Sequence, residues 1–248
     1  MKIDAKGLYY RDLNLKIREA VASGAEKIEL INVNGQYYIG DGINRPVTIT
    51  VKGVPGNDLG AFLNGASIIV MDNGQDNIGN TMNAGKVVIH GHAGDVLGYG
   101  MRGGKVHILK DVGYRIGIHM KSYNDNKPVL IAGGNAGDFF GEYMAGGVLI
   151  LLGMFTDNPD QPKHGFRFGT GMHGGVIYVR GKVDESKLSR EVGVFELTTE
   201  DQNELKEYLK DYCRDFKLDL KEILKEKFVK ILPKSKRPYG DMYCTMPR

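Results

Sequence analysis

The 248-residue sequence contains no tryptophan, only two cysteines and only eight prolines. Two cysteines, Cys213 and Cys244, are too few for a disulfide framework, a thiolate zinc site or an iron–sulfur cluster held by this chain alone. No run of about 18 apolar residues occurs, which excludes a membrane-spanning helix by length. The first residues are polar and lack the apolar stretch of a secretory signal, so we expect a cytoplasmic protein.

An excess of charge of one sign is also lacking. The sequence has 33 Lys/Arg and 30 Asp/Glu, and residues 1–200 hold 21 of each, so the net charge of +3 comes from residues 201–248. A protein that reads duplex nucleic acid needs a basic surface, which a neutral main body does not favour. We therefore expect neither a nucleic-acid partner nor a membrane partner.

Glycine, in contrast, is abundant, and its count of 35 is about twice the usual share of roughly 7%. Residues 53–181 hold 28 of these glycines, residues 1–52 hold five and residues 182–248 hold two. We divide the chain accordingly into an α/β entry segment at 1–52, a glycine-rich body at 53–183, and a helical C-terminal extension with a basic tail at 184–248. Because proline is rare, the glycine excess indicates a backbone that turns tightly and often.

The glycine-rich body is a sequence repeat. Four glycines are spaced by 19 residues and two more follow after 24 and 28, the additional residues lying in polar inserts near 122–127 and 156–163. These anchor glycines are Gly60, Gly79, Gly98, Gly117, Gly141 and Gly169. The residue before each anchor is large and apolar: Leu59, Ile78, Leu97, Ile116, Phe140 and Phe168. Three residues after each anchor stand Leu63, Met82, Met101, Met120, Met144 and Met172. A fixed period of this length is typical of a solenoid.

A short strand recurs in the same register. Eight residues after the anchors stand Ile68, Val87, Val106, Leu149 and Ile177, and ten residues after them stand Val70, Ile89, Ile108, Leu151 and Val179. Side chains two apart in a strand share a face, so both positions face inward. The position between them includes His107 and faces outward, so we expect replacement of His107 by alanine to change stability little. One strand per 19 residues predicts a mostly β protein, a right-handed parallel β-helix of about six to seven coils.

The entry segment predicts one helix and two strands. The helix begins with Asp12 as its N-cap and ends at about Ala22, and a strand follows at 27–33. Asn34-Gly35 is a strong hairpin signal, with 36–39 as the returning strand.

The C-terminal extension predicts two helices. Thr199-x-x-Gln202 has the pattern of a capping box, and a second, shorter helix follows near 223. The first helix carries an apolar stripe of Leu205, Tyr208, Leu209, Tyr212 and Phe216. We expect one face of these helices to pack on the last coil, since the end of a β-helix must be covered. A basic tail at 234–248 completes the sequence.

Two segments match the dinucleotide-binding pattern G-x-G-x-x-G, Gly98–Gly103 and Gly169–Gly174. Such a loop binds pyrophosphate where it follows a strand and opens a helix. Both segments instead occupy the repeat register and lead into a strand, so we interpret them as corners of the coil. Gly133–Asp138 has the composition of a calcium-binding nonapeptide, but it occurs once and outside the required spacing.

Polar residues recur three residues before the anchors, at Asn57, Asp76, Asp95 and Asp138. We interpret them as Asx turns that bond local N–H groups, with a metal ladder as the alternative. His90 and His92 would lie on one strand face as a conceivable metal pair, yet no third ligand follows from the sequence, and whether they bind anything stays open. His119 and His173 lie near corners, where a solvated or backbone-bonded role is favoured over catalysis.

The repeat pattern G-D-x-x-G-x-x-M-x-G-G-x-V-x-I, clearest at 94–109 and 137–151, resembles the GXGXG domain at the C-terminal end of the glutamate synthase large subunit. Ile39–Gly42 and Phe228–Pro233 also resemble that family, and the resemblance is closest to its free-standing, archaeal-type form. One coil departs from the pattern, since Ser122-Tyr123 stand where two glycines are expected, and we expect this coil to bulge outward.

The resemblance implies a β-helix without catalytic, cofactor-binding or metal-binding residues of its own. In such a complex it packs between a glutaminase (amidotransferase) subunit and an FMN/iron–sulfur synthase subunit, which carry the FMN and the iron–sulfur cluster. Together they transfer ammonia from glutamine to 2-oxoglutarate and reduce the product to glutamate.

Two alternatives accompany this interpretation. One is a GXGXG subunit of another complex, such as that of formylmethanofuran dehydrogenase or that of N-methylglutamate synthase. The other is an acyltransferase on a left-handed β-helix, which we disfavour because its six-residue repeat does not divide a period of 19 residues. The sequence leaves self-association open.

Overall fold

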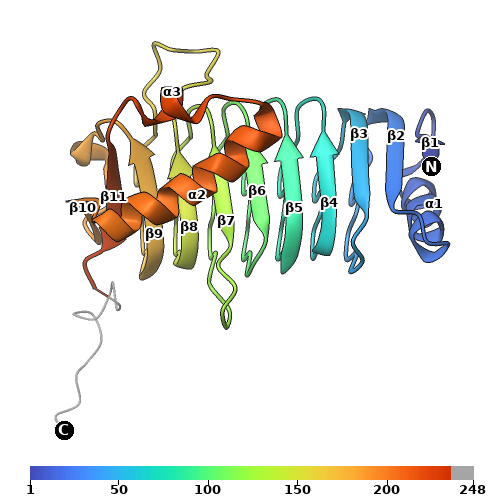
Figure 1. Cartoon of the computed structure of the whole chain (residues 1–248), viewed down its shortest axis with the longest axis horizontal. Helices are drawn as coiled ribbons and strands as arrows, with labels where there is room; N and C mark the ends of the chain where they lie inside the picture. Colours follow the sequence, from blue (N-terminus) through green and yellow to red (C-terminus); the bar gives the residue numbers. More distant parts are fainter. Residues whose placement is uncertain (236–248) are drawn as a thin grey trace, which may run out of the picture.

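The computed structural model describes residues 1–235, which form an eleven-stranded sheet running the length of the molecule (Figure 1). The strands are β1 (Lys2–Asp4), β2 (Lys27–Asn34), β3 (Thr48–Val54), β4 (Asn64–Val70), β5 (Ala84–Ile89), β6 (Lys105–Ile108), β7 (Val129–Ala132), β8 (Ala145–Leu151), β9 (Gly174–Arg180), β10 (Val192–Glu196) and β11 (Phe228–Pro233). The helices are α1 (Tyr10–Ala22), α2 (Thr199–Phe216) and α3 (Leu220–Leu224), with a 3-10 turn, η1, at Glu185–Lys187.

Strands β1 to β9 lie side by side in chain order, and every neighbouring pair among them is parallel. Parallel neighbours require the chain to travel around a full coil between strands. The result is a β-solenoid of about six turns, with a helix at its N-terminal end and helices near its C-terminal end. The predicted mostly β, parallel solenoid is therefore confirmed.

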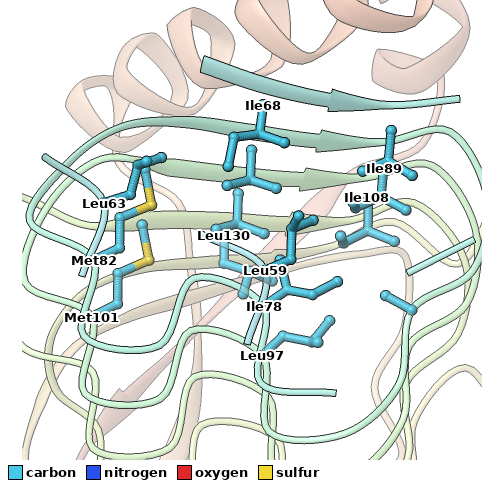
Figure 2. Packing of buried hydrophobic residues seen from close by; sticks show 14 of the residues in the cluster. Leu59, Leu63, Ile68, Ile78, Met82, Ile89, Leu97, Met101, Ile108 and Leu130 are labelled. Atoms are coloured by element: carbon cyan, nitrogen blue, oxygen red, sulfur yellow. The ribbon is translucent and has the colours of Figure 1, made fainter. Parts of the chain in front are cut away.

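Equivalent residues of successive coils lie in register in the interior (Figure 2). Val87 pairs with Ile68 on one side and with Val106 on the other, at the register that the repeat predicts. All six residues of the position three after the anchors are fully buried: Leu63, Met82, Met101, Met120, Met144 and Met172. Each coil therefore stacks one apolar side chain on the next, and the predicted inward ladder is confirmed.

The predicted hairpin at Asn34-Gly35 is wrong. β2 ends at Asn34 and pairs with β3 in parallel, so the chain makes one more coil instead of folding back. Gly60 donates its backbone N–H to Ile39 O, which places 36–43 as the corner of that first coil. Gly35 does take the positive φ that made the turn signal strong, but the stacking of whole coils determines where the chain goes next.

Helix α1, which the sequence predicts, covers the N-terminal end of the solenoid and buries Leu13, Ile17 and Ala20. It begins three residues earlier than expected. Tyr9 is its N-cap, and no side chain caps it by a hydrogen bond. Asp12 instead lies in the first turn, where its charge still interacts favourably with the helix dipole.

The insert at 122–127 is exposed and closes through a bridge between Tyr123 and Asn126, so this coil bulges outward as expected. Strand β7 then resumes the register, with Leu130 pairing with Val106.

The C-terminal extension departs from its prediction in two respects. Helix α2 does contact β9 of the last coil, but it does not cover the end of the solenoid, because it lies across the outer face of the sheet over β5 to β9 (Figure 1). The core at this end is completed instead by Val192, which packs against the backbone of Gly169, and by Ile231 of β11. In addition, β11 pairs with β9 and β10 pairs with β11, both antiparallel, so the sheet continues through two strands that the helical interpretation of this region missed. Residues 236–248 of the predicted basic tail lie outside the described residues.

Candidate functional site

A cluster of charged side chains joins α2 to the outer face of the sheet. We call Lys86, Lys105, His107, Asp211 and Asp215 the α2 latch. Lys86 Nζ lies 2.8 Å from the Asp211 carboxylate and 2.9 Å from that of Asp215. Lys105 Nζ lies 2.6 Å from Asp211. Burial raises the pKa of Asp211, but the hydrogen bonds from Lys105 and Lys86 outweigh it and hold the pKa well below its ordinary value.

His107 is the most enclosed member of the latch. Its side chain is 1% exposed, its Nδ1 lies 2.6 Å from Asp215 Oδ2, and its ring packs edge-on against Tyr212. Its Nε2 is buried and has no hydrogen-bond partner. Burial lowers the pKa of His107 despite the opposing effect of Asp215, so we expect a neutral imidazole that donates from Nδ1.

The sequence predicts correctly that the His107 side chain points out of the coil. The expectation that its replacement would change stability little is wrong, because the side chain is buried. The side chain does point out of the coil, as its position between two inward residues requires. Helix α2 then covers it, together with Ile150 and Tyr178, which occupy the same position in later coils. A histidine–carboxylate pair can act as a general base, but at 1% exposure His107 is closed to a substrate. The latch holds a helix to a sheet.

The two other histidines of this region make separate contacts. His90 packs edge-on against Phe216 of α2, with ring centroids 5.1 Å apart. His92 Nε2 lies 2.8 Å from Asp157, whose carboxylate also binds Lys110, so His92 fastens the insert near 156–163 to the coil. Within residues 1–235, no three His, Cys, Asp or Glu side chains are grouped as a metal site would require.

The aspartates of the repeat bond from coil to coil. Asp76 Oδ1 accepts the backbone N–H of Asp95 at 2.9 Å, and Asp95 Oδ1 accepts that of Tyr114 at 2.8 Å, each from the next coil. The predicted local Asx turns are therefore corrected to an inter-coil ladder. Stacking brings the equivalent N–H closer than local geometry suggests. The same ladder explains why residue 113 is a glycine, because a β-carbon at this position would overlap the Asp95 carboxylate.

Opposite the strands, the anchor-glycine corners form a surface that we call the corner face. It comprises the residues from three before to two after each anchor, including the equivalent first-coil corner at Gly40. The exposed aromatic residues of this face are Tyr37, Tyr38, Phe62, Tyr99, Tyr114, Tyr143 and Phe166. His119 stacks on Tyr143 at 5.3 Å between ring centroids, and Tyr99 packs edge-on against His119.

Comparison with known proteins identifies the repeat. The model of the GXGXG motif family matches residues 17–234, from within α1 to the residue after β11. The chain belongs to the GXGXG family. It is also 49% identical over 248 residues to a protein of Methanocaldococcus jannaschii, "Uncharacterized protein MJ1350". That alignment covers 97% of this chain and 95% of the relative.

The glycine patterns of the GXGXG solenoid are corners of the coil. Gly98–Gly103 precedes β6 and Gly169–Gly174 leads into β9, so neither segment opens a helix as a dinucleotide loop must. The anchor Gly98 has φ +67°, a backbone conformation that side chains disfavour. The interpretation of both segments as corners is confirmed.

The sequence reasoning missed the latch and the aromatic corner face of this GXGXG chain. Asp211 and Asp215 are four apart on one helical face, a signal that was available, but their partners Lys86 and Lys105 lie more than a hundred residues earlier. The aromatic residues could have been found by reading the repeat register at its corners as well as in its strands.

Cys213 lies buried on α2, where burial raises the pKa of its thiol. None of the described helices has the length and apolar character needed to cross a membrane.

The start of α2 supports a pH prediction. Thr198 caps the helix in a capping box with Asp201, one residue before the predicted box, and Asp201 also accepts a hydrogen bond from Lys230 of β11. Burial would raise the pKa of Asp201, but the bonds from Lys230 and Thr198 lower it to about 2. A depressed carboxyl pKa stabilises the fold above the ordinary value of 3.8, and this stabilisation is lost as the pH falls toward 2.

We therefore expect Lys230→Met to be less stable than the wild type at pH 7 by about 1–2 kcal/mol, because it removes a charge-assisted hydrogen bond. The difference should shrink between about pH 4 and pH 2, and urea denaturation at both ends of this range measures it. Lys210→Met is the matched control, since Lys210 pairs with Glu207 on the exposed side of α2. Equal stability of Lys230→Met and Lys210→Met at pH 7 would contradict the prediction.

Proposed function

We propose that this chain is a non-catalytic structural subunit of a glutamate synthase-like complex. It would pack between a glutaminase subunit and an FMN/iron–sulfur synthase subunit. The observation that carries the proposal is the family match from 17 to 234, because GXGXG domains are found in glutamate synthase and related complexes. The match covers 95% of the relative from Methanocaldococcus jannaschii, so in that protein the matched region makes up nearly the whole polypeptide.

The architecture suits a scaffold. Every strand from β2 to β9 has two neighbours in the sheet, and the interior is one continuous apolar cluster. In such a stack each coil is in contact with the two adjacent coils, so the coils move little relative to one another. Partner subunits bound to its sides would keep a fixed distance and orientation.

The experiment is co-expression of this chain with the glutaminase and synthase polypeptides of the same source. We expect one complex at fixed stoichiometry, and formation of glutamate from glutamine and 2-oxoglutarate that depends on this chain. Purified alone, the chain should show neither flavin absorbance nor glutaminase activity. Undiminished activity of the two catalytic subunits without this chain would overturn the proposal. Co-purification with the polypeptides of formylmethanofuran dehydrogenase would assign it to that complex instead.

A further inference from the structure

The aromatic residues of the corner face are not required by the fold. Three residues before the anchor, Asp95 makes the inter-coil hydrogen bond, whereas Tyr114 and Phe166 occupy the same position without such a side-chain acceptor. Tyr114 is 53% exposed and Phe166 is 59% exposed. Two large rings thus replace a stabilising polar residue and leave apolar surface in water.

Aromatic residues also occupy the position two residues after the anchor, where the fold does not require them. The backbone has a positive φ there, which Gly100 and Gly171 adopt freely. Phe62, His119 and Tyr143 adopt it with φ between 50° and 56°, as Thr81 does, and this conformation strains the backbone of a residue with a side chain. Strained and exposed aromatic residues at positions where glycine suffices indicate selection for binding.

Phe166 and the half-buried Phe139 beside it on the corner face are in contact with cationic side chains of this chain. Arg115 lies over the ring of Phe139 at 4.6 Å, and Arg167 approaches the same ring from the next coil at 5.7 Å. Lys187 lies 5.3 Å from the centre of the Phe166 ring. Ordered side chains lose little conformational entropy on binding, which is the property of residues that anchor protein interfaces.

The accessible charge of this surface is positive. Arg167 lies on the face, and Arg102 and Lys121 border it, four residues after their anchors; all three are exposed, and none of them makes an ion pair within residues 1–235. The neighbouring carboxylates are engaged, since Asp138 accepts a backbone N–H and Glu142 pairs with Arg115. A surface of rings and free cations is complementary to a partner surface that carries carboxylates.

The size of the corner face also suits a protein partner. Seven corners follow one another, at Gly40, Gly60, Gly79, Gly98, Gly117, Gly141 and Gly169. Six steps at the usual strand spacing of about 4.8 Å give a length of about 29 Å. A typical interface buries about 800 Å² on each partner, roughly a square of that side.

We propose that the corner face docks an acidic surface of a partner protein, with its anchor residues between the Gly98 and Gly169 corners. Tyr114 and Phe166 are the apolar anchors, and Arg167 pairs with a partner carboxylate. This inference rests on the proposed function in taking one of the catalytic subunits as the partner. Residues 236–248 do not complement the face, because they carry three basic residues and one acidic residue.

The test measures binding of the full-length chain to the purified glutaminase and synthase subunits by calorimetry. We expect Arg167→Glu, and the double variant Tyr114→Ser with Phe166→Ser, each to weaken binding to one subunit at least about tenfold. Tyr123→Ser is the control for ring removal, since Tyr123 is 58% exposed in the insert. Lys206→Glu on α2 is the control for charge reversal. Thermal melting establishes that all variants are folded.

The outcomes separate this inference from the proposed function. If a subunit binds the variants and the wild type equally, the corner face is not the docking surface, while the proposed function stands. If neither subunit binds the wild type, the proposed function fails, and a photo-reactive phenylalanine at position 166 tests the face in cells. Crosslinking from 166 but not from 123 to an acidic peptide of another protein, with that purified protein then binding Arg167→Glu more weakly, supports the inference. Crosslinks to RNA, to a second copy of this chain, or none above the level at 123 would overturn it.

Discussion

Met101→Asp is expected to destabilise the protein by about 4–6 kcal/mol, which approaches the whole stability of a typical domain. Met101 is fully buried and follows Leu63 and Met82 in the ladder (Figure 2). The substitution removes the apolar contacts of the thioether and places a carboxyl group where the ladder offers only apolar neighbours. Since neighbouring coils depend on each other, the loss should spread along the stack.

Thermal and urea denaturation measure this effect. The matched control is Arg102→Asp, one residue further along the chain, where the side chain is exposed. Substitutions at exposed positions usually change stability by about 0.5 kcal/mol or less. We expect Met101→Asp to be unfolded or insoluble and Arg102→Asp to melt close to the wild type. A melting temperature of Met101→Asp equal to that of the wild type would show that this position does not face inward.

His107→Ala is expected to destabilise the protein by about 2–4 kcal/mol, in contrast to the small effect that the sequence suggests. The substitution leaves a cavity beneath α2 and removes the Nδ1–H that binds Asp215. The control Lys105→Ala removes another member of the latch, but Lys105 is 41% exposed, so its loss should cost less than about 1 kcal/mol. A loss for His107→Ala no larger than that for Lys105→Ala would contradict the expectation.

Two further measurements identify the cause of that loss. Amide hydrogen exchange should become faster in α2 of His107→Ala, while β3 and β4 keep their protection. The pH dependence should also change. Burial holds the pKa of His107 below its usual value of 6.5, so the unfolded chain binds more protons as the pH falls through 6.5. The wild type therefore loses stability on acidification in this range, and His107→Ala should lose less.

The sequence predicted the interior of the solenoid accurately because the repeat encodes it directly. Once the chain returns every 19 residues, a residue such as Met82 must stack on Met101, and the two-residue period of a strand sets which side chains face inward. The same register predicted that the G-x-G-x-x-G segments are corners. These inferences use only local geometry and a period, both of which the sequence contains.

The wrong predictions concern places where contacts between distant parts of the chain decide the structure. The hairpin signal at Asn34-Gly35 is a local preference that the stacking of coils overrode, and Asp95 found its N–H donor in the next coil instead of nearby. In each case, a contact between distant parts of the chain outweighed a local pattern.

The sequence by itself determined the fold family, the inward ladder and the coil corners of this protein. Only the tertiary structure decided which outward residues are buried, where α2 lies and which aromatic rings remain exposed. The physical reason is separation along the chain. His107 and Asp215 are 108 residues apart, and no periodicity relates a strand residue to the helix that covers it. The free energy of that contact comes from apolar burial and charge pairing between elements that neither segment specifies alone.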